Sequence, residues 1–397
     1  MYEFKISAPG TLLLYGDPLL EMAGHNNFYI AAGLDMRTKL EFSSPFPIIV
    51  SERIFRIEFI NLKLYLEIPL RVIYECFYDQ NGIREFSSEN LMNRIKEFIK
   101  SLNIYNSTYD PTNALQNLFL QSFLYLLLSI AYEEDIEITA SILVKLSTDL
   151  PIAKGLGNVT SFIACLAACF WRWSLLQKGI VRYTFDSQDC INIRRHVWRC
   201  EKIVYNFKSM INNFATIYGV MVMYRDEIDM FTLDKMQPIK ILIVDSNINQ
   251  KITIDQLKME KLGQYVDSII TRAALDRSFE AIEQVFQKSR KEDQKRNDNF
   301  LAGLLSLDSY VKILDFINMN QSVLKARGLS NRNINFICAI AQKYSVGCKM
   351  IGTGGYVLIF ALPHVMDYDI PLLKNELVFY NYRVIETTMS CDGVRIE

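Results

Sequence analysis

The sequence predicts an α+β fold built from two domains. Its 397 residues exceed the roughly 250–300 residues at which a single hydrophobic core stops growing. Half of the residues are apolar, so there is enough material for two cores. Strand-like and helix-like runs alternate along the chain, and an interruption near residue 230 separates two such series.

The first series occupies the N-terminal half. Three runs with strand-like patterning alternate with three helix-like runs, in which apolar residues recur every three to four positions. The strand-like runs are residues 3–6, 37–42 and 137–146, and the helix-like runs are residues 90–104, 112–131 and 158–176.

The second series follows residues 225–237, where acidic residues and then Pro238 interrupt the periodicity. A domain boundary is therefore expected in that segment. Beyond it, strands are expected at residues 239–244 and 356–362, and helices at residues 254–279 and 300–318.

The charge balance excludes two classes of partner. With 43 basic and 44 acidic residues the net charge is -1, which gives no long-range attraction to nucleic acid or to an anionic membrane. The N-terminus lacks the apolar run of a secretory signal. The apolar stretch at residues 118–132 is interrupted by Gln121 and Ser122, which indicates a buried helix rather than a membrane span. We expect a cytoplasmic protein that binds neither nucleic acid nor a membrane.

The eight cysteines are scattered and include no CxxC pair, a pattern typical of reduced core thiols. Two helical pairs, Cys165 with Cys169 and His196 with Cys200, have a spacing that can seed a metal site. We regard this as a minor alternative.

Three segments contain the glycines and polar residues that a phosphate-binding site needs. They are residues 7–18 (SAPGTLLLYGDP), 149–160 (DLPIAKGLGNVT) and 348–356 (CKMIGTGGY). In the first, Pro9-Gly10 is expected to turn the chain out of one strand and Gly16-Asp17 out of the next. The second can direct backbone N–H groups and a helix N-terminus at an anion. Taken singly, each is equally typical of an ordinary hairpin, loop or tight bend.

Taken together, in this order and with these separations, the segments resemble the three motifs of the GHMP small-molecule kinase superfamily. The flanking sequence at residues 31–42, 239–247, 318–329 and 386–394 narrows the resemblance to the mevalonate kinases. It implies a two-domain GHMP kinase fold, with a ribosomal-S5-like domain at residues 1–230 and a ferredoxin-like domain at residues 231–397. ATP and substrate would meet between the two domains.

The resemblance also assigns roles to matching residues. The cofactor-binding positions are Lys154, Gly155, Gly157, Asn158, Gly352 and Gly354. The substrate-binding positions are Asp17 and Ser246, the metal-ligand position is Glu201, and the catalytic positions are Thr11 and Asn212.

Several of these positions depart from the family pattern. Thr11 replaces a lysine beside the transferred phosphate, and Asn212 replaces an aspartate that acts on the substrate hydroxyl. An amide orients a hydroxyl but cannot accept its proton, and general-base assistance contributes on the order of 10² to 10⁴ in rate. Asn158 and Val159 replace two serines, one of which binds magnesium in the family, and Tyr356 replaces a glycine. Val159 has no oxygen to offer a Mg²⁺ ion.

The substitutions favour a pseudokinase, a mevalonate-kinase-family protein that keeps the fold but has lost or greatly weakened ATP-dependent phosphotransfer. Such a protein needs no cofactor, and acts by binding a small molecule, a protein partner or a second copy of itself as a homodimer. Alternatively, Lys154 inside the phosphate loop replaces the lost charge. The protein is then a working mevalonate kinase that uses Mg-ATP in isoprenoid synthesis. Another GHMP activity, such as that of a sugar kinase, fits the flanking sequence less well.

Overall fold

The structure is a computed structural model that describes most of the chain outside a long central segment. The described residues are 2–15, 28–45, 53–79, 82–83, 87–102, 105–152, 155–207, 210–225, 229–233, 238–248, 307–326, 328–352, 354–361 and 363–397. The helix expected at residues 254–279 lies outside them.

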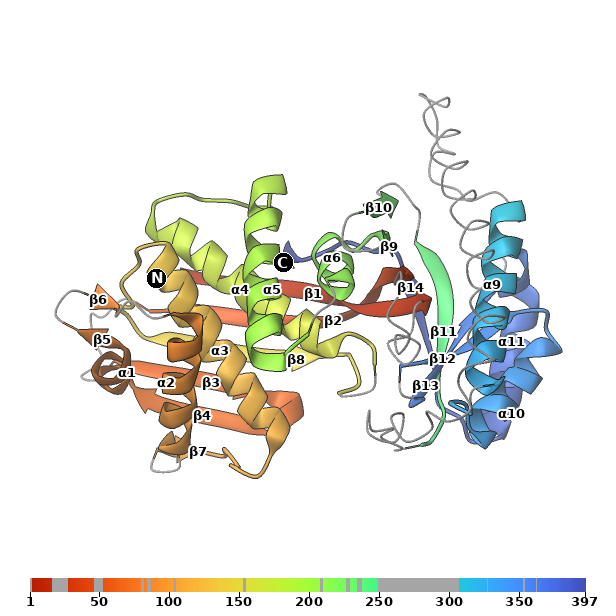
Figure 1. Ribbon diagram of the computed structural model, residues 1–397, viewed down its shortest axis with the longest axis horizontal. Helices are drawn as coiled ribbons and strands as arrows, with labels where there is room; N and C mark the ends of the chain where they lie inside the picture. The colour runs from red at the N-terminus through yellow and green to blue at the C-terminus, as the bar shows by residue number, and fades with distance from the viewer. Residues whose placement is uncertain are drawn as a thin grey trace, which may run out of the picture.

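The N-terminal half is a sheet with helices packed on one face (Figure 1). Its strands are β1 (Tyr2–Tyr15), β2 (Phe28–Ser44), β3 (Ile54–Phe59), β4 (Leu64–Pro69), β7 (Asn106–Ser107), β8 (Ile142–Thr148), β9 (Met221–Arg225) and β10 (Asp229–Leu233), with a separate pair β5 (Tyr78–Asp79) and β6 (Gly82–Ile83). Its helices are the 3-10 turn η2 (Ile60–Leu62), α1 (Leu70–Phe77), α2 (Ser88–Lys100), α3 (Ala114–Glu133), α4 (Asn158–Gln177), α5 (Ser187–Tyr205) and α6 (Ile211–Tyr218).

The C-terminal half is a second layered unit. Its elements are β11 (Ile239–Asp245), α9 (Leu307–Ala326), α10 (Arg332–Gln342), β12 (Gly347–Ile351), β13 (Tyr356–Phe360), α11 (Pro363–Phe379), β14 (Val384–Met389) and β15 (Arg395–Ile396). Strands β12, β13, β11 and β14 pair antiparallel in that order, and β14 meets β2 through Met389 and Leu34. The described strands of both halves, except the pair β5 and β6, are thereby joined into one sheet.

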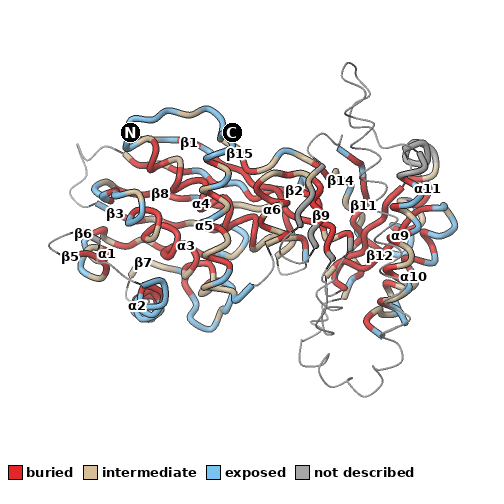
Figure 2. Tube along the Cα trace, turned by 45° about the horizontal axis from the view of Figure 1, so that its top comes forward, coloured by how far each residue is buried: buried red, intermediate tan, exposed pale blue. Residues whose placement is uncertain are grey.

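The N-terminal core lies between the sheet and helices α3 and α4 (Figure 2). Phe123 of α3 makes edge-to-face ring contacts with Phe55 of β3 at 5.4 Å and with Phe170 of α4 at 5.3 Å. Two described helices, α3 and α4, are long and apolar enough to cross a membrane, but 72% and 83% of their apolar windows are buried inside the protein. Core packing therefore accounts for their hydrophobicity.

The other face of this sheet has a row of alternating charges. Lys5, Glu41, Lys145 and Glu58 are cross-strand neighbours on β1, β2, β8 and β3. Lys5 Nζ lies 2.6 Å from Glu41 Oε1, and Lys145 Nζ lies 3.7 Å from Glu58 Oε2. Opposite charges on neighbouring strands suit a face in contact with water.

Most predicted elements within the described residues are confirmed, with shifted ends. Helices α3 and α4 begin and end within two residues of the predicted ranges. The strand predicted at residues 137–146 begins only at Ile142. Ile136 and Ile138 before it are buried in the core without joining the sheet, so their alternation reflects packing rather than strand pairing.

The turn predicted at Pro9-Gly10 is wrong. Strand β1 continues through it, and the register on β2 shifts there, because Pro9 is opposite Arg37 and Gly10 is opposite Leu34. Proline has no N–H to donate, and a bulge is one of the few sheet positions that tolerate this. The turn predicted at Gly16-Asp17 lies outside the described residues.

After β14 the chain returns to the N-terminal half. The tail, defined here as residues 390–397, passes beside α6, and β15 pairs antiparallel with β1 through Ile6 and Ile396. The predicted division into residues 1–230 and 231–397 stays a prediction, and the tail crosses it.

Candidate functional site

The first and second glycine segments meet backbone to backbone. The N–H of Thr11 donates to the carbonyl of Leu156 at 3.1 Å. Gly157, at φ +68°, has the left-handed conformation that glycine adopts without strain. A Cβ on Gly157 would lie 2.6 Å from the backbone nitrogen of Thr11. Because Gly157 is also the N-cap residue of α4, that helix begins directly against β1.

The second and third segments also touch through glycines. Gly155 and Gly352 both have positive φ angles, and a Cβ on either would lie 3.1 Å from the Cα of the other. Ser246 is fully buried and donates its hydroxyl to the carbonyl of Gly354 at 2.7 Å. The three segments therefore converge, and Ser246 holds the third turn. The predicted substrate contact of Ser246 stays a prediction.

The two positions predicted to be catalytic, Thr11 and Asn212, are brought together at this convergence. Asn212 lies in the first turn of α6, and the Thr11 hydroxyl donates to Asn212 Oδ1 at 3.3 Å. Both side chains are neutral. They can orient a hydroxyl group, but neither takes up a proton near neutral pH.

Glu201, the predicted metal ligand, lies in the interior. Its side chain is on α5, the residue is 2% exposed, and its Oε1 accepts a hydrogen bond from the Thr160 hydroxyl at 2.5 Å. Burial raises the pKa of Glu201 to about 7, although hydrogen bonds from Thr160 and Asn213 act to lower it.

The residues around Glu201 do not fit a magnesium ion. Mg²⁺ requires oxygen ligands in near-octahedral geometry and usually keeps several waters, whereas Glu201 is sealed against Thr160 and Val159 lines an apolar pocket. Within the described ranges, no three histidine, cysteine, aspartate or glutamate side chains gather in a group that could hold a metal. Neither alternative pair, Cys165 with Cys169 or His196 with Cys200, belongs to such a group, and the three cysteines are free, buried thiols as predicted.

An apolar pocket lies beside the start of α4. Phe59, Leu118 and Phe119 form part of its wall, and Asn158 and Val159 line the side next to the glycine loop. The N–H groups in the first turn of a helix have no partner inside the helix. The pocket thus has an apolar wall and lies beside a helix N-terminus, a feature suited to an anionic group.

Two of the predicted site residues cannot be placed, because Asp17 and Lys154 lie outside the described residues. Tyr356 is buried on β13, where burial, followed by the charge of Asp245, raises its pKa to about 12. Sequence reasoning missed Thr160. Its position directly after Val159 was the available signal, because a hydroxyl one residue further along α4 reaches Glu201.

No protein-family model matches the chain. Human mevalonate kinase is 21% identical over 403 residues, covering 98% of this chain and 94% of the human protein. Among solved structures, the mevalonate kinase of Methanococcus jannaschii has a TM-score of 0.64 at 16% identity, covering 98% of both chains. The galactokinase of Lactococcus lactis, solved with galactose, has a TM-score of 0.54 at 13% identity, covering 99% of this chain and 94% of its own.

The chain is a distant homologue of the mevalonate kinases. The match extends over nearly its full length and confirms both the predicted resemblance and the predicted GHMP kinase fold. The fold brings Thr11 close to Gly157 and Asn212, and Gly155 close to Gly352; their assignment to family motif positions stays a prediction.

Proposed function

We propose that this protein keeps the GHMP kinase fold and a nucleotide pocket but has lost, or retains only weakly, ATP-dependent phosphotransfer. It acts as a pseudokinase, by binding or by regulation. The contact between Thr11 and Asn212 is the main support. A threonine and an asparagine, hydrogen-bonded to each other at 3.3 Å, stand at the family's lysine and aspartate positions.

The proposed loss of phosphotransfer has an electrostatic cause. Phosphoryl transfer depends on positioning and on neutralising the charge of the phosphates. Losing one preorganised charge costs about 10² to 10³ in rate, and losing the general base costs a comparable factor. Such losses do not simply multiply, but the neutral pair of Thr11 and Asn212 provides neither contribution.

The pocket supports the binding half of the proposal. The wall that includes Phe59 and Phe119 is apolar, and phosphate groups suit the N-terminus of α4 at Asn158. The interior of the pocket measures only about 30 Å³, so a nucleotide ring would bind there only if the wall opens. The kinases of this family use Mg-ATP. Since Glu201 and Val159 do not fit a magnesium ion here, we expect adenine nucleotide to bind with little dependence on Mg²⁺.

The alternative is an active mevalonate kinase of isoprenoid synthesis. The alignment with human mevalonate kinase over 98% of this chain favours it. The relocated lysine that it requires, Lys154, lies outside the described residues. Turnover measurements separate the two functions.

The test combines thermal shift with product detection. ATP is expected to raise the melting temperature of the wild-type protein equally with Mg²⁺ and with EDTA, and incubation with ATP and mevalonate is expected to give no phosphomevalonate above background. The variant Thr11→Lys, Val159→Ser, Asn212→Asp is expected to make the ATP-induced shift Mg²⁺-dependent.

A matched control makes the same three kinds of substitution at exposed positions, as Thr112→Lys, Val181→Ser, Asn90→Asp, and is expected to behave as wild type. Robust wild-type turnover that collapses in Asn212→Ala would overturn the pseudokinase. A melting temperature that ATP does not change would overturn the nucleotide pocket.

A further inference from the structure

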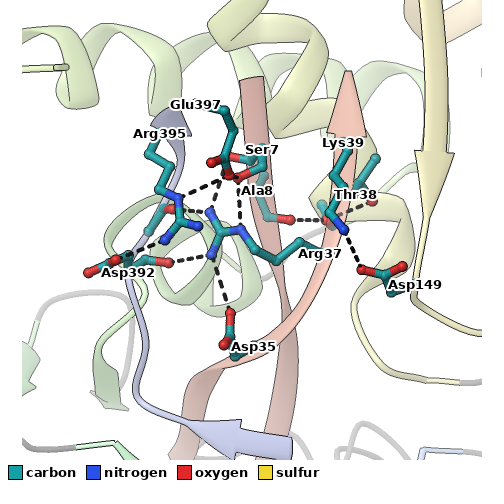
Figure 3. A network of polar contacts seen from close by, with 12 residues as sticks. Ser7, Ala8, Asp35, Arg37, Thr38, Lys39, Asp149, Asp392, Arg395 and Glu397 are labelled. Carbon is teal, nitrogen blue, oxygen red and sulfur yellow. Dashed lines mark hydrogen bonds and ion pairs between the residues drawn. The ribbon is translucent and has the colours of Figure 1, made fainter. Parts of the chain in front are cut away.

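Arg37 of β2 has a buried guanidinium that forms hydrogen bonds with the tail (Figure 3). Its Nη1 donates to the carbonyl of Asp392 at 2.8 Å, and its Nη2 donates to the carbonyl of Gly393 at 2.6 Å. On its other side, Nε and Nη2 donate to the hydroxyl and the carbonyl of Ser7, at 2.8 and 3.3 Å. The guanidinium thus joins β1, β2 and the tail through one rigid group.

The same tail segment also forms hydrogen bonds with the C-terminal end of α6. The N–H of Val394 donates to the carbonyl of Ile217 at 3.1 Å, and the N–H of Cys391 donates to the carbonyl of Gly219 at 3.0 Å. The last carbonyls of a helix have no partner inside it, so the tail supplies partners from outside. Residues 391–394 are therefore held between Arg37 and the C-terminus of α6.

Gly393 and Gly219 let the backbones of the tail and of α6 pack in direct contact. A Cβ on Gly393 would lie 2.7 Å from the carbonyl carbon of Ile217, and one on Gly219 would lie 2.5 Å from the carbonyl carbon of Asp392. The tail and the helix pack backbone against backbone, so a displacement of one moves the other.

The N-terminal end of α6 holds Asn212. The helix has only eight residues, which is about 12 Å at 1.5 Å per residue, and so short a helix moves as a rigid body. The hydrogen bond between Thr11 and Asn212 is already 3.3 Å long, beyond the range of about 2.5–3.0 Å that is usual for hydroxyl donors. A small shift at the C-terminus of α6 is enough to break it.

We propose that Arg37 is a positioning residue that acts through the tail and α6 to hold Asn212 against Thr11. Neither Arg37 nor the tail contacts Asn212 in any described interaction; the effect is transmitted by α6. This inference rests on the proposed function to the extent that Asn212 and Thr11 belong to the ligand site. The mechanical coupling itself can be measured without any ligand.

The test uses the full chain without nucleotide and the variant Arg37→Lys. Lysine keeps the charge but cannot make the forked contacts of the guanidinium. Hydrogen exchange of residues 211–218 is expected to accelerate at least about tenfold, the change that corresponds to losing about 1.4 kcal/mol of local stability. Residues 114–133 of α3 are expected to keep their wild-type exchange, which shows that the fold is intact.

A spectroscopic readout separates positioning from general stability. The side-chain amide signal of Asn212, in protein labelled with ¹⁵N-asparagine and assigned by its absence in Asn212→Ser, is expected to shift in Arg37→Lys. The matched control is Arg395→Ala, which removes the exposed part of the same network, the contacts to Asp392 Oδ2 at 2.8 Å and to Glu397 Oε1 at 3.0 Å. It is expected to leave both readouts unchanged.

Gly393→Ala provides a second route to the same effect, because its Cβ separates the tail from α6 while the Arg37 side chain itself is unchanged, although the carbonyl of Gly393 also accepts from Arg37. Both variants are expected to change the exchange of residues 211–218 and the Asn212 signal. Unchanged readouts in both, with α3 intact, would overturn the coupling. Failure of ATP to shift the wild-type melting temperature would overturn the proposed function alone.

Discussion

Two parts of the candidate site are built in different ways. Where the glycine segments meet, the contacts are backbone to backbone, as between Gly155 and Gly352, where a Cβ added to either would lie 3.1 Å from the Cα of the other. At the predicted catalytic positions, Thr11 and Asn212, the contact is between side chains. A backbone contact tolerates no added atom, whereas a side-chain contact survives replacement by another hydrogen-bonding group. This difference explains how a chain only 21% identical to human mevalonate kinase keeps the architecture around altered groups.

The largest expected effect comes from breaking a backbone contact. Gly157→Ala combines strain at φ +68° with a Cβ placed 2.6 Å from the backbone nitrogen of Thr11, and is expected to cost about 3–5 kcal/mol of unfolding free energy. Urea denaturation measures it. Gly179→Ala is the matched control, because Gly179 has a similar φ of +76° with no atom within 4 Å of the added Cβ. It is expected to cost only about 1 kcal/mol, and equal losses in the two variants would contradict the contact.

The next largest effect is expected on the pH dependence of stability, through the buried side chain of Glu201. The pKa of Glu201 is about 7 in the folded protein against an ordinary value of 4.5. Between these values the unfolded chain releases the proton that the folded protein keeps. Stability therefore falls as pH rises from 4.5 to 7, by up to about 3 kcal/mol, and is level above pH 7.

Glu201→Gln is expected to remove this slope, and to be more stable than the wild-type protein at pH 8. Urea unfolding between pH 5 and pH 8 measures it. Glu97→Gln, an exposed glutamate paired with Lys100, is expected to keep the wild-type pH dependence. Parallel curves for the wild-type protein and Glu201→Gln would show that Glu201 ionises normally.

A smaller effect is expected at the third glycine turn. Ser246→Ala removes the hydroxyl that donates to the carbonyl of Gly354 and is expected to cost about 1 kcal/mol. Chemical denaturation checks this value. The control is Ser322→Ala, whose hydroxyl donates to the carbonyl of Asn318 on an exposed helix surface, and it is expected to be nearly neutral. A neutral Ser246→Ala would mean that the glycines hold the turn unaided.

The smallest effect is expected on the open face of the N-terminal sheet. Lys5→Ala removes one partner of the ion pair with Glu41, and both side chains are more than half exposed. Water screens such a pair, so the melting temperature should not change measurably. A clear drop in melting temperature would show that the charge row contributes to stability.

The periodic elements were predictable because local pattern and tertiary packing agree in them. Helix α4, predicted at residues 158–176, is observed at Asn158–Gln177. The prediction was wrong at Pro9-Gly10, because these residues form a bulge inside a long strand instead of a turn. It was also wrong at Ile136 and Ile138, whose alternating pattern reflects burial in the core and not strand pairing. In each failure a long-range contact decides the local conformation.

The sequence by itself determined the fold class and the order of the glycine segments, because periodicity and glycine placement are local properties. It also determined that Thr11 and Asn212 are neutral. Only the tertiary structure decided that these two residues touch, that Glu201 is buried against Thr160, and that Arg37 joins the tail to β1 and β2. Each of these contacts joins residues dozens to hundreds of positions apart, and the packing of the whole chain creates it.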